Sequence, residues 1–263
     1  MGILAFKSGN HDIAEAMLTK ALRLDPTYSL VWANLAQVYS VTGQLDKAKK
    51  SFKNILNMEP RNGLIWAEYG TVLTKLANYE ESKDAYLKAL DFKSDSPRVH
   101  LSLGHVYKTM GEIENSIDSY KNTIIQNKLS GEAYWSLANL KTYSFSENEI
   151  KVMEETLKAD MSDIERSQMH FALGKAYEVK KDFDNSFNNY FKGNEVKKGL
   201  TKYSSNDTTD NTKRILDFFN LENIRDFSKS LTVNQDPIFV LGTVSYTHLR
   251  AHETSLHLVC RLL

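Results

Sequence analysis

Residues 29–62, SLVWANLAQVYSVTGQLDKAKKSFKNILNMEPRN, form one full unit of a repeat that decides the fold. Trp32 recurs 34 residues later as Trp66, and His100 and Tyr134 continue the series at the same interval. A fixed period of this length is typical of arrays in which one supersecondary unit stacks on the next. The sequence therefore predicts a solenoid.

Each unit is predicted to contain two antiparallel helices. Spacings of three, four and seven residues place apolar side chains on one helical stripe and then on a second: Trp32, Leu35, Ala36 and Tyr39, followed by Ala48, Phe52, Ile55 and Leu56. Small residues recur where the two helices would cross: Ala36, Gly70, Gly104, Ala138 and Gly174. Gly9, Gly43 and Gly111 stand where a left-handed residue would end the first helix. The expected fold class is therefore all-α.

The unit resembles the tetratricopeptide repeat, which carries W, L, G, Y, A, F, A and P at fixed offsets in 34 residues. Residues 63–96 and 97–130 also match this pattern, although Ser94 replaces the terminal proline. The resemblance implies an α-solenoid that winds as a right-handed superhelix. Met1 falls inside the first helix of a unit, so we expect the chain to begin partway through a repeat.

The fifth unit departs from the repeat after Tyr143. Its second helix is replaced by a stretch in which Ser146 is followed by Glu149, and Ser162 by Glu165. A serine with a glutamate three residues later predicts a capping box, because each side chain can satisfy an exposed amide of the other residue. We therefore expect new helices after Ser146 and after Ser162, with the solenoid continuing beyond them.

A more specific resemblance covers residues 132–198 and 236–242. The stretches EAYWSLANLKTYSFSENEI (132–150), HFALGKAYE (170–178), FNNYFKGNEVKK (187–198) and DPIFVLG (236–242) resemble the bacterial tetratricopeptide-repeat sulfotransferases. In that family a catalytic domain similar to protein-tyrosine sulfotransferases follows the repeats. The resemblance implies 3′-phosphoadenosine 5′-phosphosulfate (PAPS) as co-substrate and an acceptor hydroxyl as target.

The phosphosulfate loop of that family does not follow here. The family has G-M-P-R-S-G-[ST]-[ST], whose backbone amides and basic side chain hold the anion, whereas residues 243–263 contain no glycine. Gly242 is the only residue here that matches the family's loop motif, and it would be the start of the lost cofactor-binding loop. This chain is therefore expected to bind no cofactor and to contain no catalytic residue.

Residues 243–263 differ in composition from the rest of the chain. They include His248, His252, His257 and Cys260, the only cysteine. A zinc site built on His248 and His252 is possible by spacing, but the string resembles translated sequencing-adapter read-through. We therefore expect a non-native tail and no metal site.

Four regions are predicted along the chain. Residues 1–200 form the solenoid of about six repeats, with the first truncated, and residues 201–236 form a linker. The linker is expected to be polar and exposed at first and to contain an amphipathic helix over 213–227. Residues 237–242 are predicted to be the first strand of a missing α/β sulfotransferase domain, before the tail at 243–263.

A concave strip on the first helices of the units is the predicted binding surface for a protein or peptide. Offsets taken from the tetratricopeptide family place these residues on it: Asn34, Gln37, Glu68, Thr71, Lys75, Arg98, His105, Lys108, Trp135, Asn139 and Lys175. Amides can pair with a peptide backbone, and lysine and arginine can hold carboxylates. The alternative for each residue is an ordinary solvated helix face. His100 and His170 occupy the tryptophan position, so we expect them to pack between helices.

Two functions follow from these patterns. The first is the peptide-binding scaffold of a PAPS-dependent sulfotransferase, and the second is a free-standing repeat adaptor for protein–protein interactions. The 263 residues carry 33 Lys and Arg against 33 Asp and Glu, which argues against a nucleic-acid partner. A single cysteine, with no signal peptide and no long apolar run, predicts a cytoplasmic protein without a membrane partner.

Overall fold

A computed structural model describes residues 1–94, 96–200 and 204–219. The chain divides into two compact units, Met1–Thr201 and Lys202–Leu263. The first unit contains α1 (Gly2–Lys7), α2 (His11–Leu24), α3 (Ser29–Val41), α4 (Leu45–Met58), α5 (Gly63–Lys75), α6 (Tyr79–Asp91), α7 (Pro97–Met110), α8 (Ile113–Gln126), α9 (Gly131–Ala138), α10 (Glu147–Thr156), α11 (Asp163–Val179) and α12 (Phe183–Leu200). The second contains α13 (Ser205–Phe218). The described residues form helices and no strand, which confirms the all-α prediction.

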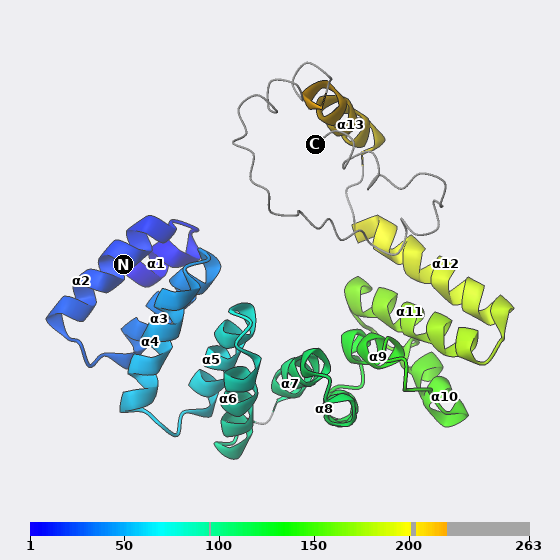
Figure 1. The fold of residues 1–263 in the computed structure, drawn as a ribbon, viewed down its shortest axis with the longest axis horizontal. Helices are drawn as coiled ribbons and strands as arrows, with labels where there is room; N and C mark the ends of the chain where they lie inside the picture. The colour runs from blue at the N-terminus through cyan, green and yellow to red at the C-terminus, as the bar shows by residue number, and fades with distance from the viewer. Residues whose placement is uncertain (95, 201–203, 220–263) are drawn as a thin grey trace, which may run out of the picture. The chain divides into compact units, whose positions relative to one another are not determined.

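Successive helix pairs stack side by side along the first unit (Figure 1). The paired helices are α1 with α2, α3 with α4, α5 with α6, α7 with α8, and α11 with α12, and the second helix of a pair also contacts the next pair. Buried apolar side chains form clusters that each span several helices, from Ala14 to Ala85, from Tyr86 to Val106, and from Tyr120 to Ala176. The core therefore runs along the stack, because one pair cannot bury its apolar stripe alone.

The predicted small residues lie at the close crossings within pairs. A Cβ atom at Gly104 would stand 2.6 Å from the Tyr120 side chain, so only glycine fits there. Ser116, one turn before Tyr120, donates its hydroxyl to the Gly104 carbonyl at 2.9 Å. The same crossing recurs at Gly70 with Ser82 and at Gly174 with Ser186, with the hydroxyl 2.8 Å from the carbonyl in each. The serine thus bonds directly to the facing helix, which its small size permits.

The turns inside the pairs use a left-handed residue, as predicted at three glycines. Gly9, Gly43 and Gly111 have φ angles of 78°, 76° and 82°. Ala77 stands at the same position of the third unit and is left-handed as well, with a φ of 58°. Its backbone makes the same turn, because the Asn78 amide donates to the Leu73 carbonyl at 2.9 Å.

The fifth unit is irregular as expected, but one of the two capping boxes is not formed. Ser146 and Glu149 form a complete box at the start of α10. Ser162 caps α11 by accepting a bond from the Glu165 amide, whereas the Glu165 carboxylate accepts bonds from the Gly131 and Glu132 amides at the start of α9. The prediction of a second box was therefore wrong. Because Gly131 lacks a side chain, the α11 backbone at Glu165 can approach the start of α9 closely. The Glu165 carboxylate therefore finds the Gly131 amide as a partner outside its own helix.

Residues 205–212, in the polar part of the predicted linker, are helical. α13 begins at Ser205, where Ser204 accepts a hydrogen bond from the Asp207 amide at 3.2 Å, and it ends at Phe218. Hydroxyl groups of Thr208, Thr209 and Thr212 donate to the carbonyl four residues earlier, so the polar side chains are compatible with the helix. None of the α13 residues is buried.

The predicted strand at 237–242 and the tail at 243–263, with Gly242 and the zinc hypothesis, lie outside the described residues. Within the described helices, none has both the length and the apolar character required to cross a membrane.

Candidate functional site

The predicted binding residues lie on the first helices of the pairs, α3, α5, α7, α9 and α11, with Asn139 at the end of α9. The structure brings some of them together and leaves others apart. The contacts fall into two places, a pocket between α5 and α7 and a polar contact that joins α7, α8 and α9.

The α5–α7 pocket has a volume of about 240 Å³. Its lining residues are Leu64, Ala67, Glu68, Thr71, Tyr86, Ser94, Ser96, Arg98, Val99 and Ser102. Three of the predicted residues, Glu68, Thr71 and Arg98, therefore share one pocket. Small side chains such as Ala67 leave the space, and Leu64, which is 71% exposed, provides an apolar edge.

An ion pair lies at this pocket. Arg98 Nη1 is 3.3 Å from Glu68 Oε1, and the two side chains are 70% and 37% exposed. Because a guanidinium has five N–H donors, Arg98 can keep this contact and still donate to a ligand oxygen. Glu68 and Arg98 thus offer both an acceptor and a donor beside an apolar surface.

The pocket also contains a pair of hydroxyl groups. Thr71 Oγ1 and Tyr86 Oη are 3.1 Å apart, and the Tyr86 ring is buried between α5 and α6. Thr71 is also 3.1 Å from the Ala67 carbonyl on its own helix. The Thr71 hydroxyl is therefore fixed by one contact on its own helix and one on α6.

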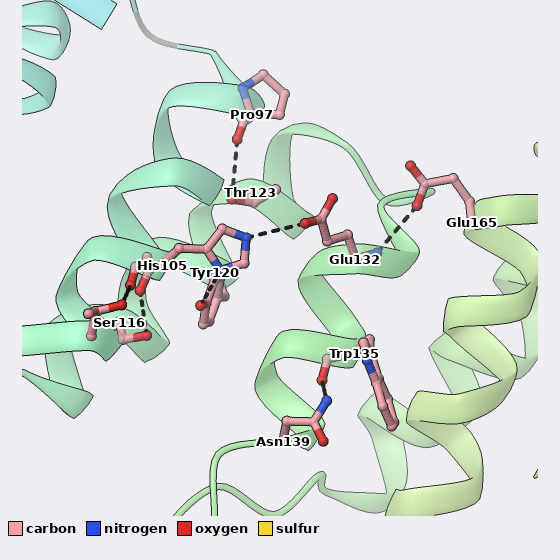
Figure 2. Close-up of polar contacts among 11 residues, drawn as sticks. Pro97, His105, Ser116, Tyr120, Thr123, Glu132, Trp135, Asn139 and Glu165 are labelled. Atoms are coloured by element: carbon pink, nitrogen blue, oxygen red, sulfur yellow. Dashed lines mark hydrogen bonds and ion pairs between the residues drawn. The ribbon is translucent and has the colours of Figure 1, made fainter. Parts of the chain in front are cut away.

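His105 makes the equivalent contact one repeat later and extends it to the next unit (Figure 2). Its Nδ1 is 2.8 Å from Tyr120 Oη on α8, and its Nε2 is 3.3 Å from Glu132 Oε1 on α9. The hydrogen bond with His105 lowers the pKa of Glu132, and burial opposes this effect. Burial raises the pKa of Tyr120, so its hydroxyl stays protonated.

Glu132 and the two tyrosines were not among the predicted site residues. Glu132 lies 34 residues after Arg98, so the repeat period was a signal that could have found it. Tyr86 and Tyr120 stand one and two repeats after Phe52, which the apolar stripe placed in the core, and they are buried. Only their hydroxyl groups reach the polar contacts.

The remaining predicted residues are dispersed. The Asn34 and Asn139 amide groups donate to the Leu30 and Trp135 carbonyls of their own helices, at 2.7 and 2.9 Å. Each amide group thus uses one of its two N–H donors on its own helix, whereas the sequence had suggested amides that are free for a peptide backbone.

Side chains on α9 and α11 pair locally as well. Trp135 packs against Phe171 with ring centroids 5.6 Å apart, and Lys175 pairs with Glu178 at 3.1 Å. Gln37, Lys75 and Lys108 are exposed and take no part in the pocket or in the His105 contact.

The two histidines at the tryptophan position are half-buried. His170 Nδ1 is 3.0 Å from Asn189 Oδ1 on α12, and burial lowers its pKa. The tryptophans themselves make a different bond: Trp32 and Trp66 donate through Nε1 to the carbonyls of Pro26 and Pro60, both at 2.8 Å. His170 is thus packed between α11 and α12.

Throughout the part of the chain that the structure describes, no group of three His, Cys, Asp or Glu side chains is placed to hold a metal ion.

Comparison with known families agrees with the repeat. Residues 5–67 match a model described as tetratricopeptide repeat, and residues 70–111 match one described as TPR repeat. Residues 5–67 and 70–111 therefore carry tetratricopeptide repeats. The two models cover α2–α4, α5 apart from residues 68 and 69, α6 and all of α7, where the 34-residue period is most regular. No curated protein matches the chain in sequence.

Three solved structures illustrate the similarity in fold. PilF of Pseudomonas aeruginosa is 20% identical with a TM-score of 0.56, and the match covers 72% of this chain and 85% of PilF. YrrB, described as a TPR protein with an unusual peptide-binding site, is 17% identical with a TM-score of 0.53, covering 68% and 91%. MamA is 20% identical with a TM-score of 0.51, covering 77% and 98%. At these identities the likeness establishes the fold.

Proposed function

We propose that this chain is a tetratricopeptide-repeat scaffold that binds a protein partner through an extended peptide segment lying across the first helices of the pairs. The α5–α7 pocket is the observation that carries the proposal. It gathers an apolar edge, an ion pair and hydroxyl groups into a volume of about 240 Å³, enough for one side chain of a ligand.

The chemistry of the pocket fits a peptide better than a small polar metabolite. An apolar side chain can lie against Leu64, Ala67 and Val99 while the peptide backbone bonds to the groups at the edge. Arg98 can donate to a backbone carbonyl, and Glu68 can accept from a backbone amide. The peptide-binding site described for YrrB, which shares the fold, supports this class of ligand.

The sulfotransferase scaffold remains a narrower form of the same proposal. It rests on the resemblance of residues 132–198 and 236–242, of which 236–242 lie outside the described residues, and neither matched family model is that of a sulfotransferase. The free-standing adaptor requires only the repeats, so it is the function that the observations support best.

A peptide selected from a random peptide library displayed on phage tests the proposal. The affinity of that peptide is measured for the wild type, for Leu64→Asp and for Arg98→Glu. Both side chains are largely exposed, so the substitutions should preserve the fold, which circular dichroism verifies. We expect each variant to bind on the order of tenfold more weakly, since each removes one anchor of the ligand.

Lys53→Glu on α4 is the matched control, because it makes the same charge reversal at an exposed position away from the pocket. Binding unaffected by Leu64→Asp and Arg98→Glu, or weakened equally by Lys53→Glu, would refute the assignment of the pocket.

A further inference from the structure

Three phenylalanines form an exposed stripe on α12. Phe183, Phe187 and Phe191 are 67%, 72% and 53% exposed, and their spacing of four residues places them on one side of the helix. The Phe187 and Phe191 rings stack with centroids 6.4 Å apart. Aligned exposed aromatic rings on a surface helix are typical of an interaction surface.

The stripe does not face α11. The side of α12 that packs on α11 carries Ser186, Tyr190 and Gly193, which contact Gly174 and Phe171. From the helical period, the phenylalanines lie about a quarter turn from that side.

The same positions are covered by helices in an earlier repeat. Ile113 and Ile117 stand 70 residues before Phe183 and Phe187, on α8, and they pack against the apolar cluster formed by the following helices. The side of α8 that carries Ile113 and Ile117 is therefore covered by the helices that follow it, and the phenylalanines of α12 occupy the same side of their helix. α12 is the last helix of the first unit, and its stripe is exposed.

Charged side chains next to the stripe are complementary to a second copy of the same helix. Asp184 lies in the first turn of α12 and Lys198 in the last, and both are exposed. The helical period puts both beside the stripe, separated by about 21 Å along the axis. In an antiparallel pair of α12 helices centred on Phe191, Asp184 of each copy lies opposite Lys198 of the other. The two helix dipoles also oppose each other favourably.

We propose that the Phe183–Phe191 stripe is a self-association surface on which α12 of a second copy packs antiparallel. In this register the two Phe191 rings face each other, whereas Phe187 and Phe183 lie against the partner helix near its residues 195 and 199. The six rings, each roughly two-thirds exposed, offer on the order of 800 Å² of apolar surface. With the flanking helix surface this reaches the size of a small specific interface, about 1,000 Å².

The first test measures the mass of the full chain by sedimentation equilibrium. We expect the wild type to dimerise, and Phe187→Asp to weaken the dimer on the order of a hundredfold because it places a carboxylate among the rings. Ile125→Asp on α8 is the matched control, since Ile125 is 73% exposed and lies away from the stripe. A wild type that is monomeric at about 100 µM, or a dimer that Phe187→Asp does not weaken, overturns the proposal.

The second test reverses the charges. Asp184→Lys and Lys198→Asp should each weaken the dimer roughly tenfold at low salt, because each creates two like-charge contacts. The double variant should restore the wild-type dimer. Asp184 and Lys198 are too far apart to meet within one helix, so restoration requires two copies in antiparallel contact. A double variant no better than the single variants would overturn the antiparallel arrangement.

Discussion

Replacing Ala77 by glycine should stabilise the protein, although glycine usually destabilises. Ala77 has a φ of 58°, where a side chain meets the neighbouring carbonyl, and this conformation costs a residue other than glycine about 1–2 kcal/mol. Glycine avoids that cost but loses about 0.5–1 kcal/mol more backbone entropy on folding. Ala77 is exposed, so its methyl group contributes little packing. The expected net gain is about 0.5–1 kcal/mol.

The reciprocal change, Gly43→Ala, should cost a similar amount. Gly43 stands at the same position of the second unit with a φ of 76°, and nothing lies within 4 Å of an added Cβ, so the cost comes from the backbone alone. Urea unfolding followed by circular dichroism measures both variants. Since repeat arrays can depart from two-state unfolding, the comparison is between midpoints of transitions with equal slopes.

Ala159→Gly is the control, because Ala159 is exposed and does not have a positive φ. It should lose about 0.5–1 kcal/mol. If Ala77→Gly lowers the midpoint as Ala159→Gly does, the left-handed turn does not strain Ala77 and the reasoning fails.

Two further predictions concern α11. Glu165→Ala should destabilise the protein by about 1–2 kcal/mol, because it removes the carboxylate that accepts from the α9 amides, whereas Glu155→Ala at the exposed end of α10 should change the unfolding midpoint little. Equal effects of the two substitutions would contradict the cap. For His170, burial lowers the pKa from 6.5, so the unfolded chain binds a proton that the folded chain does not, and stability should fall as the pH drops below 6.5. His170→Gln should lose less stability than the wild type between about pH 7.5 and about pH 5.5, and an unchanged pH dependence would contradict this cause.

Much of the fold could be predicted from the repeat because its determinants are local or periodic. Gly70, Gly104 and Gly174 mark the crossings directly, since a larger residue would meet the facing tyrosine. Gly9, Gly43 and Gly111 mark the turns because they adopt a left-handed conformation. α13 was predicted less well: its polar first half has no apolar period, and its start depends on the Ser204 cap and on threonine bonds to its own backbone.

The candidate site was predicted only in outline. The family offsets placed Glu68, Thr71 and Arg98 on the first helices, but their shared pocket depends on the distance between α5 and α7. The offsets also suggested free amides at Asn34 and Asn139, whereas each bonds to its own helix, which is always within reach.

The sequence by itself determined that this chain is a stack of helix pairs, because a 34-residue period of apolar stripes can be buried in no other way. Only the tertiary structure decided where individual polar groups bond. Glu165 could have capped its own helix, and it caps α9 instead because the Gly131 amide lies close enough to donate to its carboxylate. His105 likewise joins three helices through Tyr120 and Glu132. A polar side chain has several possible partners along the chain, and packing selects one by bringing it within hydrogen-bond distance.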